Sequence, residues 1–196
     1  MLDEQQIEQI ASNLTVPDAT AIRDQKAAIQ NSAQATSEGR KVEIDQEIGQ
    51  HQRFNQSRAT RAAAGAQEMA GHVANHFKSG SKSSITEAAM SKVRIQAEQD
   101  FLSDVLRASQ QRIDAARTRL RQAELATMKA NIEFMEADVV LMAVQHRDAA
   151  KQLLETDPSI EQIPFGPRIV EALTLIARMR VDLTQKEKEG NSNGTN

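Results

Sequence analysis

The chain contains no cysteine, tryptophan or tyrosine, and its only aromatic residues are five phenylalanines among 196 residues. Without cysteine, disulfide bonds and thiolate metal sites are excluded. Compact globular cores and small-ligand pockets depend on aromatic side chains for much of their contact area. The shortage of rings therefore favours helices that pack on helices through Ala, Leu, Ile and Met.

Long uncharged apolar runs are also missing. The most apolar window, 125–144, contains Lys129, Glu133, Glu136 and Asp138, whereas a membrane-spanning helix needs about 18 consecutive apolar residues. The first residues lack the basic start and apolar core of a secretory signal peptide. We therefore expect cytoplasmic synthesis, followed by assembly into a particle or export without a signal peptide. The compartment itself stays open.

A heptad pattern runs almost unbroken from Ile85 to Val144, with apolar residues at alternating spacings of three and four. This pattern predicts a very long helix with a seam that other helices cover. Alanine recurs every seven residues along one edge of the seam, which allows two helix backbones to approach closely. The pattern leaves open whether the pair forms within one chain or between chains. The predicted seam consists of Leu106, Ile113, Ala116, Leu120, Ala123, Ala130, Phe134, Ala137, Leu141 and Val144.

The long helix is expected over about 84–156, because a Ser/Gly-rich hinge precedes it and Pro158 disfavours helical geometry in the residue before it. Pro167 can start a last helix that folds back antiparallel on the C-terminal half of the long one. A second apolar stripe in that half predicts a neighbour on a second side. Its members are Leu125, Met128, Ile132, Met135, Val139 and Met142. The expected fold is therefore all-α, an elongated helical bundle or coiled coil.

The rest of the chain predicts three further parts. Residues 1–40 are expected to form short, partly flexible helices, with Asp3 as an N-cap, Pro17 at the first position of the second helix, and a break near Ser37–Gly39. Residues 41–83 should form an Ala/Gly-rich helix and the hinge, and interior glycines such as Gly65 imply bending, fraying or close packing. The domain 84–189 then holds the long helix and the last helix, which Gly190 ends. Residues 190–196 are expected to form a disordered tail.

No pattern of catalytic residues, phosphate loop or dinucleotide fingerprint is present. His72 and His76 are spaced to share one helical face, but the intervening residues lack the glutamate of a zinc protease helix. We therefore assign no catalytic residue, no metal site and no cofactor. Arginines crowd the stretch 107–121, which indicates either a solvated helix face or an assembly contact.

The net charge of −3 gives no reason to expect nucleic acid as the main partner. The expected function is non-enzymatic: a structural or assembly protein that oligomerises through a coiled coil with itself or with neighbouring subunits. The composition, rich in Gln, Ala and Ser, resembles that of subunits of virion or secretion assemblies. The alternative is a membrane-interacting effector or translocated protein whose small-residue-rich segment 59–77 changes state on delivery.

Overall fold

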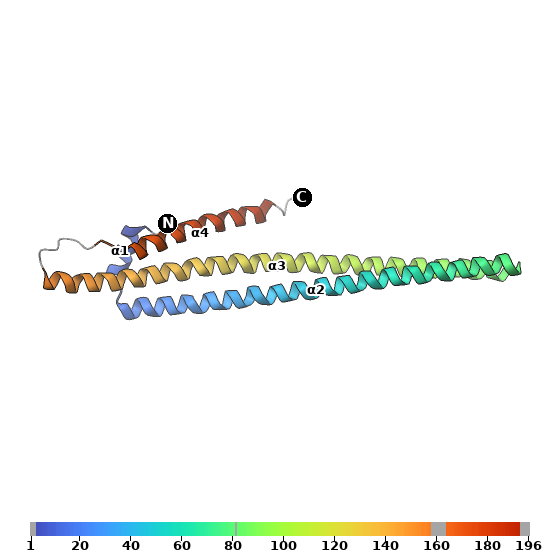
Figure 1. The fold of residues 1–196 in the computed structure, drawn as a ribbon, viewed down its shortest axis with the longest axis horizontal. Coiled ribbons are helices and arrows are strands. Elements are labelled where there is room, and N and C mark those ends of the chain that lie inside the picture. Colours follow the sequence, from blue (N-terminus) through green and yellow to red (C-terminus); the bar gives the residue numbers. More distant parts are fainter. Residues whose placement is uncertain (1–2, 81, 158–163, 193–196) are drawn as a thin grey trace. The chain divides into compact units, whose positions relative to one another are not determined.

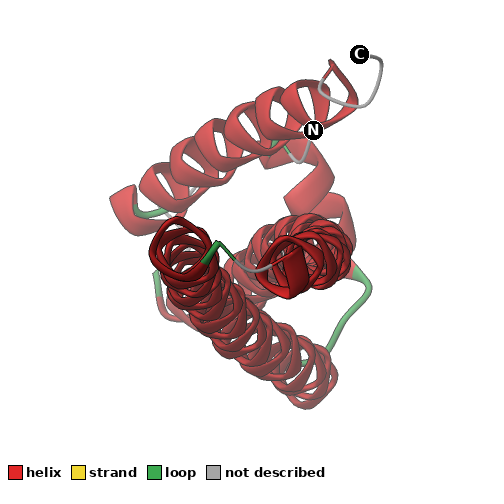
Figure 2. Cartoon of the chain, turned by 90° about the vertical axis from the view of Figure 1, so that its right-hand side faces the viewer, coloured by secondary structure: helices red, strands yellow, loops and turns green. Residues whose placement is uncertain are grey.

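The computed structural model of the chain describes residues 3–80, 82–157 and 164–192. Within these ranges it contains four α-helices and no strand (Figures 1 and 2). The helices are α1 (Glu4–Ser12), α2 (Val16–Ser79), α3 (Lys82–Thr156) and α4 (Pro167–Ser192). The predicted all-α fold, with one very long helix and a shorter C-terminal helix folded back on it, is confirmed. None of the described helices is long and apolar enough to cross a membrane.

The first two helices begin with reciprocal side-chain caps. Asp3 Oδ1 accepts a hydrogen bond from the Gln6 N–H at 2.8 Å, and Gln6 Oε1 accepts one from the Asp3 N–H at 3.3 Å. Thr15 and Asp18 form the same kind of pair at the start of α2. Such pairs satisfy backbone donors that a helix start leaves free. The prediction of Asp3 as an N-cap is confirmed, but Pro17 occupies the second position of α2 rather than the first.

The predicted break near Ser37–Gly39 is wrong, because α2 runs without interruption from Val16 to Ser79. Ser37 is buried in this helix rather than exposed in a loop. A polar residue with a side chain as small as that of serine fits a close contact between helices. A single interior glycine lowers the stability of a helix by only about 1 kcal/mol relative to alanine. The packing of a 64-residue helix therefore outweighs the local signals for a turn.

The hinge between the long helices is shorter than predicted. Gly80 takes a positive φ of 63°, and its N–H donates to the His76 carbonyl at 2.9 Å. A glycine in this conformation commonly ends a helix, because it lacks the Cβ that would clash there. The next helix, α3, already begins at Lys82 and ends at Thr156, the predicted end. The last helix begins at Pro167 as predicted but continues past Gly190 to Ser192.

The chain forms two compact units. Unit 1 comprises Met1–Gly39 and Leu120–Asn196, and unit 2 comprises Arg40–Arg119. Each unit therefore contains part of α2 and part of α3. The division of the chain in sequence order into 1–40, 41–83, 84–189 and 190–196 stays a prediction, and residues 193–196 of the expected tail lie outside the described residues.

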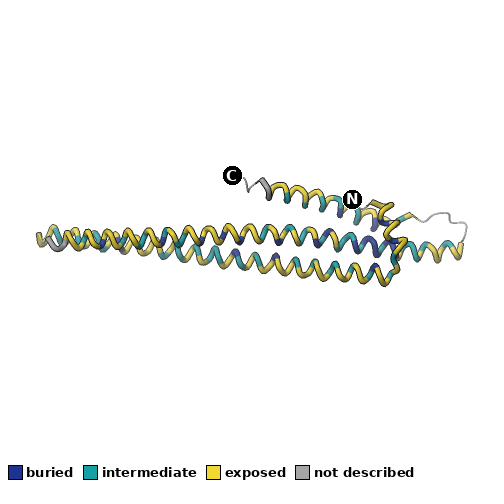
Figure 3. The backbone as a smooth tube through the Cα atoms, turned by 180° about the vertical axis from the view of Figure 1, so that it is seen from behind, coloured by how far each residue is buried: buried dark blue, intermediate teal, exposed yellow. Residues whose placement is uncertain are grey.

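The main apolar core lies in unit 1, where all four helices contribute to it (Figure 3). Ile7 of α1, Val139 and Val144 of α3, and Ile176 of α4 are almost completely buried. Residue numbers rise along α4 as they fall along α3 in the contacts between them, so the two helices are antiparallel. Unit 1 is thus a small helical bundle in which α3 has neighbours on more than one side.

Unit 2 is a hairpin of two antiparallel helices, 40–79 of α2 and 82–119 of α3. Its buried apolar residues include Ile44, Leu102, Ile113 and Ala116. Ser91 and Ser109 are buried in the same hairpin. Because two helices can cover only one side of each other, most of the hairpin surface stays exposed.

Candidate functional site

The ten predicted seam residues are all buried or half-buried. The helix that lies beside this seam is α2 of the same chain. In unit 1, Thr127 Oγ1 donates to the Ala33 carbonyl at 3.1 Å, and Gln30 Nε2 donates to Asn131 Oδ1 at 3.0 Å. The α2–α3 pair within one chain therefore covers much of the seam, and Leu141 and Val144 also belong to the core of unit 1 to which all four helices contribute. A role of the seam between chains stays a prediction.

The second stripe lies on the part of α3 that α4 covers. Ile132 and Val139 belong to the buried core, and Met135 and Met142 pack against it. Side chains of α4 pack against the same core, namely Leu173, Met179 and Leu183. Arg180 of α4 pairs with Glu136, and Lys129 pairs with Glu187 at 2.8 Å. Leu125 and Met128, the two members nearest the middle of α3, are half-buried.

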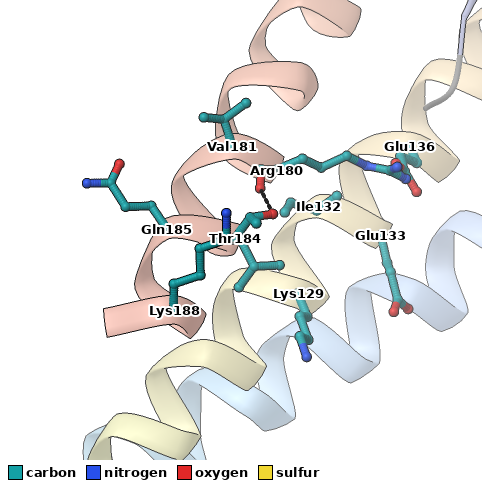
Figure 4. A pocket seen from close by; sticks show the side chains of 10 residues that line it. Lys129, Ile132, Glu133, Glu136, Arg180, Val181, Thr184, Gln185 and Lys188 are labelled. Atoms are coloured by element: carbon teal, nitrogen blue, oxygen red, sulfur yellow. Dashed lines mark hydrogen bonds and ion pairs between the residues drawn. The ribbon is translucent and has the colours of Figure 1, made fainter. Parts of the chain in front are cut away.

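An open groove remains between α3 and the C-terminal half of α4 (Figure 4). Its volume is about 790 Å³, which lies in the range of small-molecule pockets. Ile132, Leu183 and Val181 supply apolar lining, and charged side chains form much of the rest. The charged members are Lys129, Glu133, Glu136, Arg180 and Lys188. We call this feature the α3–α4 groove.

The arginine-rich stretch 107–121 is largely engaged within its own chain. Arg112 Nε pairs with Glu47 at 3.0 Å and Arg119 Nη2 with Glu43 at 2.5 Å, both across the hairpin of unit 2. Hydrogen bonds from Arg40 and then Arg119 hold the pKa of Glu43 below its ordinary value. Sequence reasoning missed these pairs because their members lie 65 and 76 residues apart along the chain.

A polar cluster joins α2 and α3 further along the hairpin. Ser91 Oγ donates to Glu68 Oε1 at 2.9 Å and lies 3.3 Å from His72 Nε2. His72 Nδ1 lies 3.8 Å from Glu87 Oε2, and Arg94 pairs with Glu68. The Ser91 hydroxyl, followed by the charges of Arg94 and His72, lowers the pKa of Glu68.

The cluster brings together a serine, a histidine and carboxylates, the side chains used in acyl transfer. Its hydrogen bonds fit that chemistry poorly, because the Ser91 hydroxyl donates to Glu68 instead of to the histidine. Acyl transfer also needs donors aimed at a developing oxyanion, and the surrounding backbone N–H groups are used inside two helices. The arrangement can instead hold α2 and α3 in register. Within the described ranges, no group of three or more potential metal ligands is present.

Two polar residues of α3 that lie between seam residues, Thr127 and Ser109, differ in their hydrogen bonds. Thr127 is satisfied, since its hydroxyl bonds the carbonyls of Ala33 and Ala123. Ser109 is 0% exposed, and its Oγ has no hydrogen-bond partner in the described part of the chain. A buried hydroxyl without a partner destabilises a helix pair. Ser109 therefore lowers the stability of the α2–α3 pair in unit 2.

A comparison of the chain with family models, with curated proteins and with solved structures found no match.

Proposed function

We propose that this chain is a non-enzymatic structural protein that assembles with copies of itself through its helices. The composition favours a virion or a secretion machine as the larger assembly. The proposal is supported by a fold in which helix packing accounts for nearly every buried side chain. It is also supported by the polar cluster of unit 2, whose geometry suits the joining of two helices better than catalysis.

One observation carries the proposal: α3 of unit 2 presents large apolar side chains outward. Met90 and Val93 are each 70% exposed and Phe101 is 66% exposed. Their spacings of three and eight residues place them on one side of the helix. We call these three residues the outer face of α3. The inward side of the same stretch holds buried Ser91 and half-buried Glu98 beside half-buried Ile95 and buried Leu102. Exposed apolar clusters of this kind mark interaction sites.

Sedimentation equilibrium over a wide range of protein concentrations tests the proposal. We expect the weight-average mass to rise above that of the 21.6 kDa monomer as concentration increases. A mass that stays at the monomer value at every concentration would contradict self-association.

A second candidate function, contact with a membrane, is favoured by the end of the hairpin. Phe77 is 83% exposed, and Val73 and Ile85 are exposed near it in the chain. Exposed apolar side chains of this kind can enter the interfacial layer of a bilayer. Flotation with anionic liposomes at neutral and acidic pH tests this candidate. Failure of the protein to float at both pH values would exclude it.

A further inference from the structure

We infer that copies of this chain associate head to tail, with the outer face of α3 in unit 2 of one copy docked in the α3–α4 groove in unit 1 of the next. The inference rests on the proposed self-association and names the two surfaces that would carry it. Three observations support it: the charges of the units, the complementary character of the two surfaces, and their location on different units.

The two units carry charge of opposite sign. Residues 40–119 contain 13 Lys and Arg against nine Asp and Glu, a formal net charge of +4. The remainder of the chain contains 11 Lys and Arg against 18 Asp and Glu, a net charge of −7. Opposite net charges steer the approach of two surfaces and suppress the approach of like units. Unit 2 of one copy is thus attracted to unit 1 of another, whereas identical units repel each other.

The two docking surfaces both contain apolar side chains. The outer face of α3 offers Met90, Val93 and Phe101, which are mainly exposed. The lining of the α3–α4 groove includes half-buried Leu183 and Val181, which is 62% exposed, beside Ile132 of the core. Apolar centres with a polar rim are the usual anatomy of protein interfaces. Docking would therefore remove apolar side chains of both surfaces from water.

Four of the five charged residues that line the groove are paired within unit 1. Lys129 pairs with Glu187, Glu136 with Arg180, and Glu133 with Lys26 of α2 at 2.7 Å. Docking therefore does not require the incoming helix to neutralise the charges of these three pairs. The opposite net charges of the units then favour the approach of unit 2 to unit 1, and apolar contact governs the strength of association.

Because the two surfaces differ and lie on different units, the contact is heterologous. One such contact leaves one surface free on each copy, so association continues into a filament or closes into a ring, which can have only two members. A contact between identical faces would also form a dimer. Mixing two variants, each with one surface blocked, distinguishes these cases.

The experiment uses Val93→Asp, which blocks the outer face, and Val181→Asp, which blocks the groove, each in the full-length chain. Both side chains are exposed, so we expect both variants to keep the wild-type helical circular dichroism and melting temperature. For each variant alone, the dissociation constant of self-association should be at least about tenfold higher than that of the wild type. Mixed one to one, they should form a heterodimer, because the mixture restores one intact pair of surfaces. Wild-type protein should associate more tightly than this mixture under the same conditions, because each of its copies keeps both surfaces.

Val42→Asp is the matched control, since Val42 is an exposed valine of unit 2 that lies outside both surfaces. We expect it to associate like the wild type. The use of aspartate in both test variants prevents the two changed residues from pairing with each other. Higher ionic strength should weaken the wild-type association, because salt screens the opposite charges of the units.

The possible failures are distinguishable. If both variants associate like the wild type, the two surfaces are wrong and self-association stands. If both variants are monomeric but do not form a heterodimer on mixing, the head-to-tail arrangement is wrong. If wild-type protein itself is monomeric at every concentration, this inference and the proposed function both fail.

Discussion

Gly65 of α2 lies so close to Ile95 of α3 that a β-carbon at position 65 would stand 3.1 Å from three atoms of the isoleucine side chain. This contact explains one of the interior glycines of α2. Gly39, Gly49 and Gly71 have no atom within 4 Å of a β-carbon placed on them, so packing does not require glycine at those positions.

The difference between Gly65 and Gly71 predicts opposite effects of the same substitution. Gly71→Ala should stabilise the protein by about 1 kcal/mol, because alanine is a better helix former than glycine. Gly65→Ala should gain less than this or destabilise, since the added methyl group overpacks the contact with Ile95. Chemical denaturation followed by circular dichroism measures both free energies of unfolding. Equal stabilisation by the two substitutions would contradict the close approach at Gly65.

Ala123 and Ala126 provide a test of the seam in unit 1. Ala123 is buried and Ala126, one turn further along α3, is exposed. Ala123→Asp should destabilise the protein by about 3 kcal/mol or more, because it places a charge in a helix contact. Ala126→Asp should cost less than about 1 kcal/mol, the loss in helix propensity. Thermal unfolding of both variants distinguishes them, and similar melting temperatures would mean that the heptad assignment is wrong.

The unpartnered hydroxyl of Ser109 predicts a stabilising substitution. Ser109→Ala should raise the free energy of unfolding by about 1 kcal/mol, because it removes a buried polar group that has no hydrogen bond. Thr127→Val is the contrasting change, since the Thr127 hydroxyl bonds Ala33 of the neighbouring helix. It should lower the free energy of unfolding by about 1 kcal/mol. Urea denaturation checks both, and a loss of stability in Ser109→Ala would show that this hydroxyl has a partner.

The polar cluster of unit 2 predicts a shifted titration. The pKa of Glu68 lies below its ordinary 4.5, first because the Ser91 hydroxyl donates to it and then because of the nearby charges of Arg94 and His72. Ser91→Ala should move this pKa upward, whereas Ser103→Ala, which removes a hydroxyl bonded to the Gln99 carbonyl, should not. A carbon-detected NMR titration of the Glu68 carboxyl measures the change. An unchanged pKa in Ser91→Ala would contradict the hydrogen bond.

The same pKa has a consequence for stability. A carboxyl with a folded-state pKa below its unfolded value adds stability that is fully present above the unfolded value, here about 4.5, and that is lost as the pH falls through the folded value. Glu68→Gln should therefore flatten the fall in melting temperature below about pH 4.5. Glu124→Gln, at an exposed position of α3, serves as the control. Identical pH profiles for wild type and Glu68→Gln would rule out this contribution.

The heptad pattern was sufficient to predict α3 and the covered positions from Leu106 to Val144, because a seam residue repeats at a fixed period whichever helix covers it. Ile85, where the pattern begins, is 52% exposed. The end at Thr156 and the start of α4 at Pro167 were also predictable, since proline restricts the backbone locally. The break in α2 was predicted wrongly, because Ser37 and Gly39 carry local turn signals that long-range packing overrides. The Glu43–Arg119 pair and the Glu68 cluster could not be found in the sequence, as the hairpin brings together residues far apart in the chain.

The sequence by itself determined that the chain is helical, which side of α3 is covered between Leu106 and Val144, and that its C-terminal half needs a second neighbour. These properties follow from local helix propensity and from the period of apolar residues, and both depend only on residues within a single helix. Only the tertiary structure decided that α2 of the same chain covers the seam, that Arg40–Arg119 forms a separate unit of opposite charge, and that Met90, Val93 and Phe101 point outward. A repeat specifies a face of a helix, but the partner of that face depends on how distant segments pack.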